Sequence, residues 1–107
     1  MPVNIQGSVA AKFLCSLTDL NIETIFANAG TDFAPLIEAS IALRAQGKRC
    51  PDFVTVPHEN VAVAMAIGHY RATGQLAVVM VHTTVGTANA LCGIMNAFRD
   101  HVPLLLV

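Results

Sequence analysis

Residues 54 to 60 read Val54-Thr55-Val56-Pro57-His58-Glu59-Asn60, an apolar extended run that ends in a carboxylate where a helical pattern begins. Between Asp52 and Arg71 the only formally charged side chain is Glu59. A carboxylate in apolar surroundings is costly to desolvate, and it tends to keep or share a proton unless a partner compensates. Glu59 is therefore either a functional acid or an anion in the first turn of a helix, where the helix dipole stabilises it by about 0.3–1 kcal/mol.

Helical and extended patterns alternate along the chain, with no linker-like segment and no internal repeat. The patterns predict strands at residues 24–27, 53–56 and 76–81 and from residue 104, and helices at residues 8–20, 35–45, 59–71 and 87–99. Ser8 is a candidate N-cap of the first helix, and Thr31 and Asp32 are candidate N-caps of the second. Strands separated by helices indicate an α/β fold, with a parallel sheet covered by helices on both faces.

Three polar loops follow the predicted strands, at residues 28–32, 57–60 and 82–89. In open parallel sheets, ligands bind at the carboxyl ends of the strands, beside the N-termini of helices. The polar residues of the chain gather in these three loops. We therefore expect a single site at this edge of the sheet.

The third loop carries small polar residues and Gly86, which suits close approach of the backbone to a ligand or to another chain. It is not a G-x-G-x-x-G fingerprint, and the chain contains no G-x-x-x-x-G-K-[ST] pattern, so the sequence does not favour a nucleotide ligand. Asn89 either contacts a ligand or braces its own helix. His82 is either a satisfied interior histidine or a catalytic group.

The composition is unusually apolar for a solvated monomer. Of 107 residues, 54% are hydrophobic and only 12% are charged, so we expect part of the surface to face more protein. Residues 104–107 form an apolar run with β character at the end of the chain. Because a parallel strand needs both faces covered, we expect this to be a truncated domain.

Several classes of function are disfavoured. The net charge of −1 gives no electrostatic footprint for nucleic acid or an anionic membrane. Residues 72–98 lack charge, but their polar residues and glycines divide them into a strand, a turn and a helix rather than a membrane span. The three cysteines lack a paired spacing, which indicates buried reduced thiols, and residues 1–6 do not resemble a secretory signal. Both features favour a cytoplasmic protein.

Together, the three loops resemble the pyrimidine-binding domain of thiamine diphosphate-dependent enzymes of the acetolactate synthase, pyruvate decarboxylase and benzoylformate decarboxylase group. Order and spacing agree, and almost the whole chain is covered. The matching segments are residues 25–31 (IFANAGT), residues 57–60 (PHEN) with residues 64–74 (AMAIGHYRATG), and residues 82–89 (HTTVGTAN) with residues 93–103 (GIMNAFRDHVP). The resemblance implies the thiamine diphosphate-binding fold, present as a partial pyrimidine-binding domain over residues 1–107.

The resemblance also implies a role for Glu59. In this family a glutamate at this position hydrogen-bonds N1′ of the cofactor's aminopyrimidine and promotes the imino form, whose 4′-nitrogen removes the proton from thiazolium C2. A weakly solvated acid suits that sharing of a proton. The activated cofactor attacks a 2-oxo acid and acts as the electron sink for loss of carbon dioxide.

Further site residues follow from the same resemblance. His82 is similar to the active-site histidine of benzoylformate decarboxylase-like members, and Thr31 stands where those enzymes carry a hydroxyl side chain beside the substrate. His82 would then move protons, and both residues would contact the substrate. We also expect Gly30, Gly86 and Asn89 to lie against the cofactor.

The family's second half-site has no counterpart in this sequence. Relatives bind the diphosphate and Mg²⁺ through a separate domain with a Gly-Asp-Gly and downstream Asn pattern, which is absent here. The central and diphosphate-binding domains are therefore expected outside this chain, and no metal site is expected within it. Because relatives form the site between two subunits, the resemblance implies a homodimer or homotetramer. The substrate stays open, since Ala29 stands where many relatives have proline.

The leading hypothesis is the N-terminal part of a thiamine diphosphate-dependent lyase or transferase that decarboxylates a 2-oxo acid, with or without joining the product to an acceptor. This piece alone is expected to be inactive. The alternative is a catalytically silent binding or assembly domain that keeps the fold without the chemistry. A nucleotide-binding regulatory domain is disfavoured by the absent phosphate-binding patterns.

Overall fold

The computed structural model describes residues 7–107, so the expectation about a signal in residues 1–6 lies outside the described residues. Helices and strands alternate along the chain, as predicted. The elements are α1 (Val9–Asp19), β1 (Thr24–Ala27), the short 3₁₀ helix η2 (Thr31–Phe33), α2 (Ala34–Ala45), β2 (Asp52–Thr55), α3 (Glu59–Thr73), β3 (Val78–Met80), α4 (Thr83–Arg99) and β4 (Leu105–Leu106).

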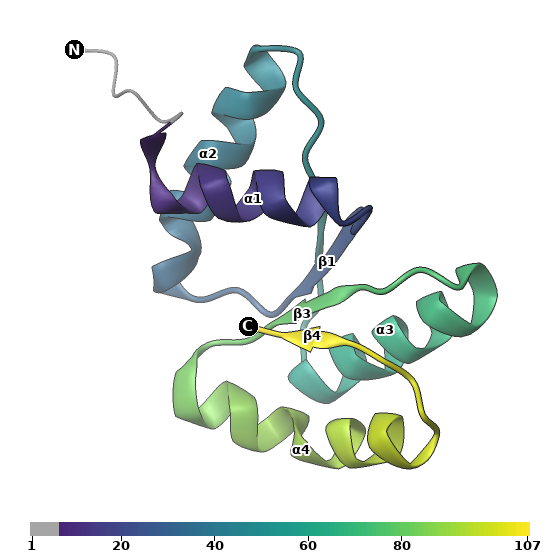
Figure 1. Ribbon diagram of the computed structural model, residues 1–107. Coiled ribbons are helices and arrows are strands. Elements are labelled where there is room, and N and C mark those ends of the chain that lie inside the picture. The colour runs from purple at the N-terminus through teal and green to yellow at the C-terminus, as the bar shows by residue number, and fades with distance from the viewer. Residues whose placement is uncertain (1–6) are drawn as a thin grey trace.

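The four strands form one parallel sheet in the order β2-β1-β3-β4 (Figure 1). The chain leaves β1 toward β2 on one side, and then returns past β1 to place β3 on the other side. This reversal makes the boundary between β1 and β3 a topological switch point, where the loops at the strand ends diverge and leave room for a ligand. The predicted α/β fold is confirmed.

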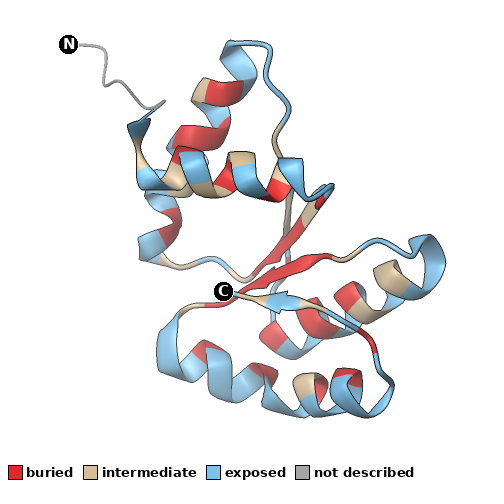
Figure 2. Cartoon of the chain, viewed as in Figure 1, coloured by how far each residue is buried: buried red, intermediate tan, exposed pale blue. Residues whose placement is uncertain are grey.

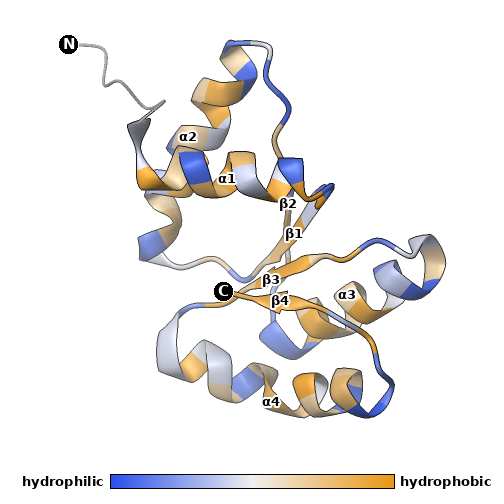
Figure 3. Ribbon diagram, in the orientation of Figure 1, coloured by the Kyte–Doolittle hydropathy of each residue, from blue (hydrophilic) through white to orange (hydrophobic). Residues whose placement is uncertain are grey.

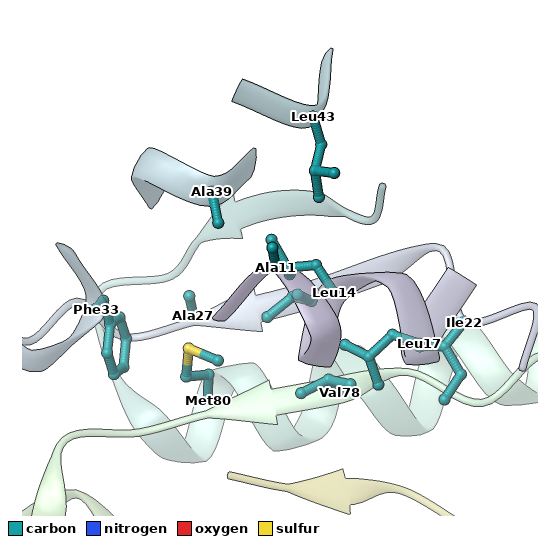
Figure 4. Packing of buried hydrophobic residues seen from close by; sticks show 11 residues of the cluster. Ala11, Leu14, Leu17, Ile22, Ala27, Phe33, Ala39, Leu43, Val78 and Met80 are labelled. Carbon is teal, nitrogen blue, oxygen red and sulfur yellow. The ribbon is translucent and has the colours of Figure 1, made fainter. Parts of the chain in front are cut away.

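Helices cover both faces of the sheet, as predicted (Figures 1 and 2). Helices α1 and α2 pack together on one face, and α3 and α4 pack together on the other. Each face has its own apolar core, built around Leu14, Ile25 and Met80 on the α1–α2 side (Figure 4) and around Val56, Val63 and Val79 on the α3–α4 side.

The central strands show why the sequence makes a sheet at this place. Along β1, Ile25 belongs to the α1–α2 core and Phe26 to the α3–α4 core, while Val78 and Val79 alternate in the same way along β3. Side chains of a strand point alternately to its two faces, so an uninterrupted apolar run fits a strand that is covered on both. Burial of each such side chain stabilises the fold by about 1.5–3 kcal/mol.

Helix ends follow local chemistry at three positions. The Ser8 side chain accepts a hydrogen bond from the Ala11 N–H at 3.1 Å and caps α1, as predicted. Gly47, with φ of 71°, follows the end of α2, and Gly74, with φ of 72°, ends α3. Both conformations lie in the left-handed region that glycine adopts without steric cost.

The prediction that Thr31 and Asp32 are N-caps is wrong. Helix α2 begins at Ala34, and its N-cap is Phe33, which makes no capping hydrogen bond through its side chain. The chain instead enters α2 through η2, with the Phe33 N–H donating to the Gly30 carbonyl at 3.2 Å. The Asp32 carboxylate is therefore available to a residue from another loop.

The prediction of a loop at residues 82–89 is also wrong. Helix α4 begins at Thr83, four residues earlier than expected, so Gly86 and Asn89 lie in its first two turns. Glycine and small polar residues are typical of loops, but here Gly86 and Gly93 are buried and let α4 approach its neighbours closely. Tertiary packing outweighs the weak local helix preference of this segment.

Two further sequence predictions can be compared with the structure. The cysteines are free, as expected, but none is buried: Cys15 and Cys50 are half-buried and Cys92 is exposed, so that part of the prediction is wrong. Figure 3 shows that β3 and β4 are apolar, whereas apolar and polar residues alternate along the helices. Over the described residues, no helix combines the length and the apolar character needed to cross a membrane.

Candidate active site

Glu59 is the first residue of α3, directly beyond the carboxyl end of β2. His58 caps this helix, because its Nδ1 accepts a hydrogen bond from the Asn60 N–H at 3.1 Å. That bond occupies the Nδ1 lone pair, so the 4.0 Å approach of His58 Nδ1 to Glu59 Oε2 is a neighbour contact rather than an ion pair. Glu59 thus lies in the first turn of a helix, one of the two alternatives stated from the sequence. This position is compatible with a functional role for the acid.

The Glu59 side chain is withdrawn from solvent. The residue is only 8% exposed, as expected for an acid flanked by valines. Asn89 on α4 donates a hydrogen bond to Glu59 Oε2 at 3.2 Å. Within residues 7–107 Oε1 accepts no hydrogen bond, and since no buried side-chain oxygen there lacks a partner, Oε1 is accessible to solvent. One carboxylate oxygen is thus held and the other is available to a ligand.

Gly86 borders the carboxylate from the first turn of α4. A Cβ atom at this position would lie 3.0 Å from Val81 Cβ and 3.5 Å from Glu59 Oε1. A longer side chain would therefore fill the space beside the available oxygen. Gly86 therefore keeps the approach to Oε1 open, and its contact with a cofactor stays a prediction.

His82 and Asp32 form a second polar pair at the same edge of the sheet. His82 follows β3 and Asp32 lies in η2 after β1, and His82 Nδ1 lies 2.8 Å from Asp32 Oδ1. Both side chains are half-exposed, so neither is the satisfied interior histidine or the simple cap that the sequence also allowed. Asp32 is a site residue that the sequence pattern does not predict.

Gly30 lies directly against this pair. A Cβ atom on Gly30 would come within 2.5 Å of His82 Nδ1 and 2.6 Å of Asp32 Oδ1, distances that real Cβ atoms do not reach. Its φ of −135° is open to any residue, so the requirement for glycine here comes from space rather than from backbone strain. The backbone of Gly30 thus packs directly against the His82 ring.

Asn28 joins the ends of three strands. Its side chain donates to the Val56 carbonyl at 3.0 Å, beyond β2, and its backbone N–H donates to the Met80 carbonyl of β3 at 2.9 Å. This residue fixes the relative positions of the loops that carry Glu59 and His82. No local pattern predicts this role for Asn28, because its hydrogen-bond partners lie far along the chain.

Two threonines complete the description of the site. Thr31 is exposed at the start of η2, beside Asp32, and its hydroxyl makes no hydrogen bond within the described residues. Thr83 follows His82 with φ of 52°, an unusual conformation for a β-branched residue. Such backbone strain costs about 1–3 kcal/mol and concentrates at functional sites.

A separate cavity of about 350 Å³ lies at the opposite, amino-terminal edge of the sheet. Its two arginines are paired: Arg44 pairs with Asp52 at 2.7 Å, and Arg49 pairs with Glu23. The hydrogen bond that Arg44 donates to Asp52 raises the pKa of Arg44 above its ordinary value. The cavity lies away from the carboxyl ends of the strands, where Glu59 and His82 are found. It is therefore separate from the candidate active site. Over residues 7–107, no cluster of three or more His, Cys, Asp or Glu side chains could hold a metal ion.

The fold and the site define a class: a parallel α/β domain with a buried carboxylate and a histidine at the carboxyl edge of its sheet. The chain belongs to the thiamine pyrophosphate enzymes, whose N-terminal TPP binding domain matches residues 8–107. Thiamine pyrophosphate is the same compound as thiamine diphosphate. The family resemblance stated from the sequence is confirmed.

Two curated relatives show the breadth of the family. The chain is 37% identical over 100 residues to the acetolactate synthase isozyme 3 large subunit of Escherichia coli, covering 94% of this chain and 17% of that protein. It is 30% identical over 88 residues to a benzoylformate decarboxylase of Pseudomonas aeruginosa, covering 79% of this chain and 15% of that protein. The chain therefore spans only about a sixth of the length of these relatives.

The fold is also that of a solved structure. Benzoylformate decarboxylase from Polynucleobacter necessarius superposes with a TM-score of 0.74 at 20% identity, over 91% of this chain and 17% of that one. At this identity the likeness shows the fold alone. It confirms the expected parallel sheet with helices on both faces.

Proposed function

We propose that this domain supplies Glu59 as the acid that activates the aminopyrimidine of thiamine diphosphate in an enzyme acting on 2-oxo acids. The observation that carries the proposal is that the two oxygens of one buried carboxylate have different surroundings. Asn89 holds Oε2 at 3.2 Å, while Oε1 is available beside Gly86. A fixed acid with one available oxygen suits proton exchange with a ring nitrogen.

The residues present fit the aminopyrimidine end of the cofactor. Gly86 leaves room beside Oε1 that a side chain would fill, and Glu59 is so little exposed that few water molecules compete with a ring nitrogen for this oxygen. In this proposal Glu59 binds the ring at Oε1 and moves a proton there, and His82 moves protons on the substrate side of the site. When bound, the cofactor supplies the electron sink for decarboxylation.

The proposal extends to parts of the protein outside this chain. We propose that another domain holds the diphosphate and Mg²⁺, and that the full protein is a homodimer or homotetramer in the cytoplasm. Large apolar side chains on the outer sides of α3 and α4 support the oligomer, since Phe98 is 82% exposed and Val85 is 70% exposed. Sedimentation of the full-length protein tests this, and a monomer would contradict it.

The central test compares Glu59→Gln with the full-length parent protein. Glutamine keeps the size of the side chain but cannot exchange the carboxyl proton, so exchange of the thiazolium C2 hydrogen for deuterium should slow by roughly 10²–10⁴-fold. Glu38→Gln is the matched control, because Glu38 is an exposed acid on α2. Unchanged exchange in Glu59→Gln would reject the role of Glu59.

Calorimetry separates the enzyme from a silent assembly domain. The full-length protein should take up thiamine diphosphate with Mg²⁺, and Glu59→Gln should retain measurable uptake, since most contacts to the diphosphate lie elsewhere in this proposal. Absence of uptake in the parent protein would favour the silent domain. Product analysis with pyruvate and with benzoylformate then distinguishes the substrate.

A further inference from the structure

We propose that Asp32 is a positioning residue for His82, which fixes the orientation and the protonated nitrogen of its imidazole ring. This inference rests on the proposed function, in which His82 moves protons at the substrate. His82 Nδ1 lies 2.8 Å from Asp32 Oδ1, and a carboxylate accepts but cannot donate when ionised. The hydrogen of a neutral ring is therefore held on Nδ1, where it is donated to Asp32.

The consequence falls on the other ring nitrogen. With the hydrogen held on Nδ1, the lone pair of a neutral imidazole lies on Nε2. Within residues 7–107 Nε2 makes no hydrogen bond, so it is available to a substrate or a solvent molecule. Asp32 thus decides which nitrogen of His82 is available to accept a proton.

Steric contact with the Gly30 backbone supports the same orientation of the His82 ring. The Gly30 Cα lies so close to the ring that an added Cβ would come within 2.6 Å of His82 Cγ. The backbone of Gly30 therefore limits movement of the imidazole on one side while Asp32 binds its Nδ1. Two constraints from the loop after β1 thus act on a residue that follows β3.

The topology explains why these loops meet. Strands β1 and β3 are neighbours at the switch point of the sheet, so the segments after them start side by side. Asp32 is separated from His82 by 50 residues in sequence but adjoins it in space. Since the side chains are half-exposed, this hydrogen-bonded pair adds little to stability, and its main effect is on the orientation of the ring.

The test uses Asp32→Ala and Asp32→Asn in the full-length protein, each crystallised and assayed with pyruvate and with benzoylformate. Asp32→Ala removes the acceptor, so the His82 ring should turn away from its parent orientation. Turnover should fall roughly tenfold to a hundredfold, with KM changed by less than about threefold. Asp32→Asn keeps an amide oxygen that accepts from Nδ1, and it should retain the ring orientation and most of the turnover. Glu38→Gln is again the exposed control.

The outcomes distinguish this inference from the proposed function. In Asp32→Ala, exchange at thiazolium C2 should match the parent protein, because that step depends on Glu59. An unchanged His82 orientation in Asp32→Ala would overturn the inference, and so would a turned ring with unchanged turnover. If the parent protein itself shows no C2 exchange and turns over neither substrate, the proposed function fails, and the ring orientation alone then decides the role of Asp32.

Discussion

Asn89 and Glu59 join the two helices on one face of the sheet through a hydrogen bond of 3.2 Å from amide nitrogen to carboxylate oxygen. Asn89 lies in the second turn of α4 and Glu59 starts α3. The expectation that Asn89 contacts the cofactor stays a prediction. What the structure shows is a hydrogen bond by which Asn89 holds one carboxylate oxygen and leaves the other available.

Replacing Asn89 tests this bond. Asn89→Ala should slow C2 deuterium exchange in the full-length protein by roughly tenfold, the equivalent of about 1.4 kcal/mol of lost hydrogen bonding. Asn89→Asp should slow exchange further, because it sets two carboxylates against each other. Asn96→Ala is the matched control, since Asn96 is exposed further along α4. Equal exchange rates in all three variants would show that Asn89 does not position Glu59.

Gly93 controls the approach of α4 to α3. A Cβ atom here would lie 2.6 Å from Asn60 Oδ1 and 2.8 Å from Val63 Cγ1, so Gly93→Ala must push the helices apart. We expect a loss of about 1–3 kcal/mol, seen as a lower midpoint of thermal unfolding. Gly68→Ala on α3 is the control, because nothing lies within 4 Å of its Cβ position. It should raise the midpoint, since alanine favours a helix over glycine by about 0.5–1 kcal/mol. A midpoint unaffected by Gly93→Ala would contradict the close packing.

Asn28 should stabilise the site edge of the sheet. Asn28→Ala removes the donor to the Val56 carbonyl, and we expect a cost of about 0.5–1.5 kcal/mol in the free energy of unfolding. Because Val56 leads into the loop that carries Glu59, C2 exchange should slow as well, by less than in Asn89→Ala. Asn96→Ala again provides the baseline. If Asn28→Ala and Asn96→Ala have the same free energy of unfolding and the same C2 exchange rate, the hydrogen bond from Asn28 to Val56 contributes nothing.

Gly30→Ala should reproduce the effect of removing Asp32. The new methyl group would overlap His82 Nδ1 at 2.5 Å and Asp32 Oδ1 at 2.6 Å, so the pair must separate. Turnover of a 2-oxo acid should fall, with little change in C2 exchange. Gly7→Ala serves as the control, because nothing in residues 7–107 lies within 4 Å of its Cβ position. A crystal structure of Gly30→Ala with the pair intact would contradict the steric argument.

The sheet and the position of Glu59 could be predicted from sequence because their signals are local. The apolar runs of β1 and β3 alternate between two cores, and Glu59 stands alone among valines at a strand-to-helix junction. Such patterns depend only on neighbouring residues. The order of the three loops, which resembles that of the family, then implies that Glu59 is the functional acid.

The start of α4 and the role of Asp32 could not be predicted in this way. Residues 83–89 look like a loop, since their small polar and glycine residues favour a helix weakly, and only the packing of Gly86 and Gly93 makes the helix stable. The sequence predicts only a helix cap at Asp32, because its partner, His82, lies 50 residues away. Contacts across such distances leave no trace in the periodicity of a single sequence.

The early start of α4 has a mechanical consequence. His82 is the residue before this helix, and Asn89 lies in its second turn. One rigid helix therefore positions both the imidazole and the amide that binds the Glu59 carboxylate. A sliding or tilting movement of α4 would displace the two groups together. If the proposed function holds, activation of the coenzyme and proton transfer at the keto acid would be mechanically coupled through α4, and an effector that shifts this helix would change both.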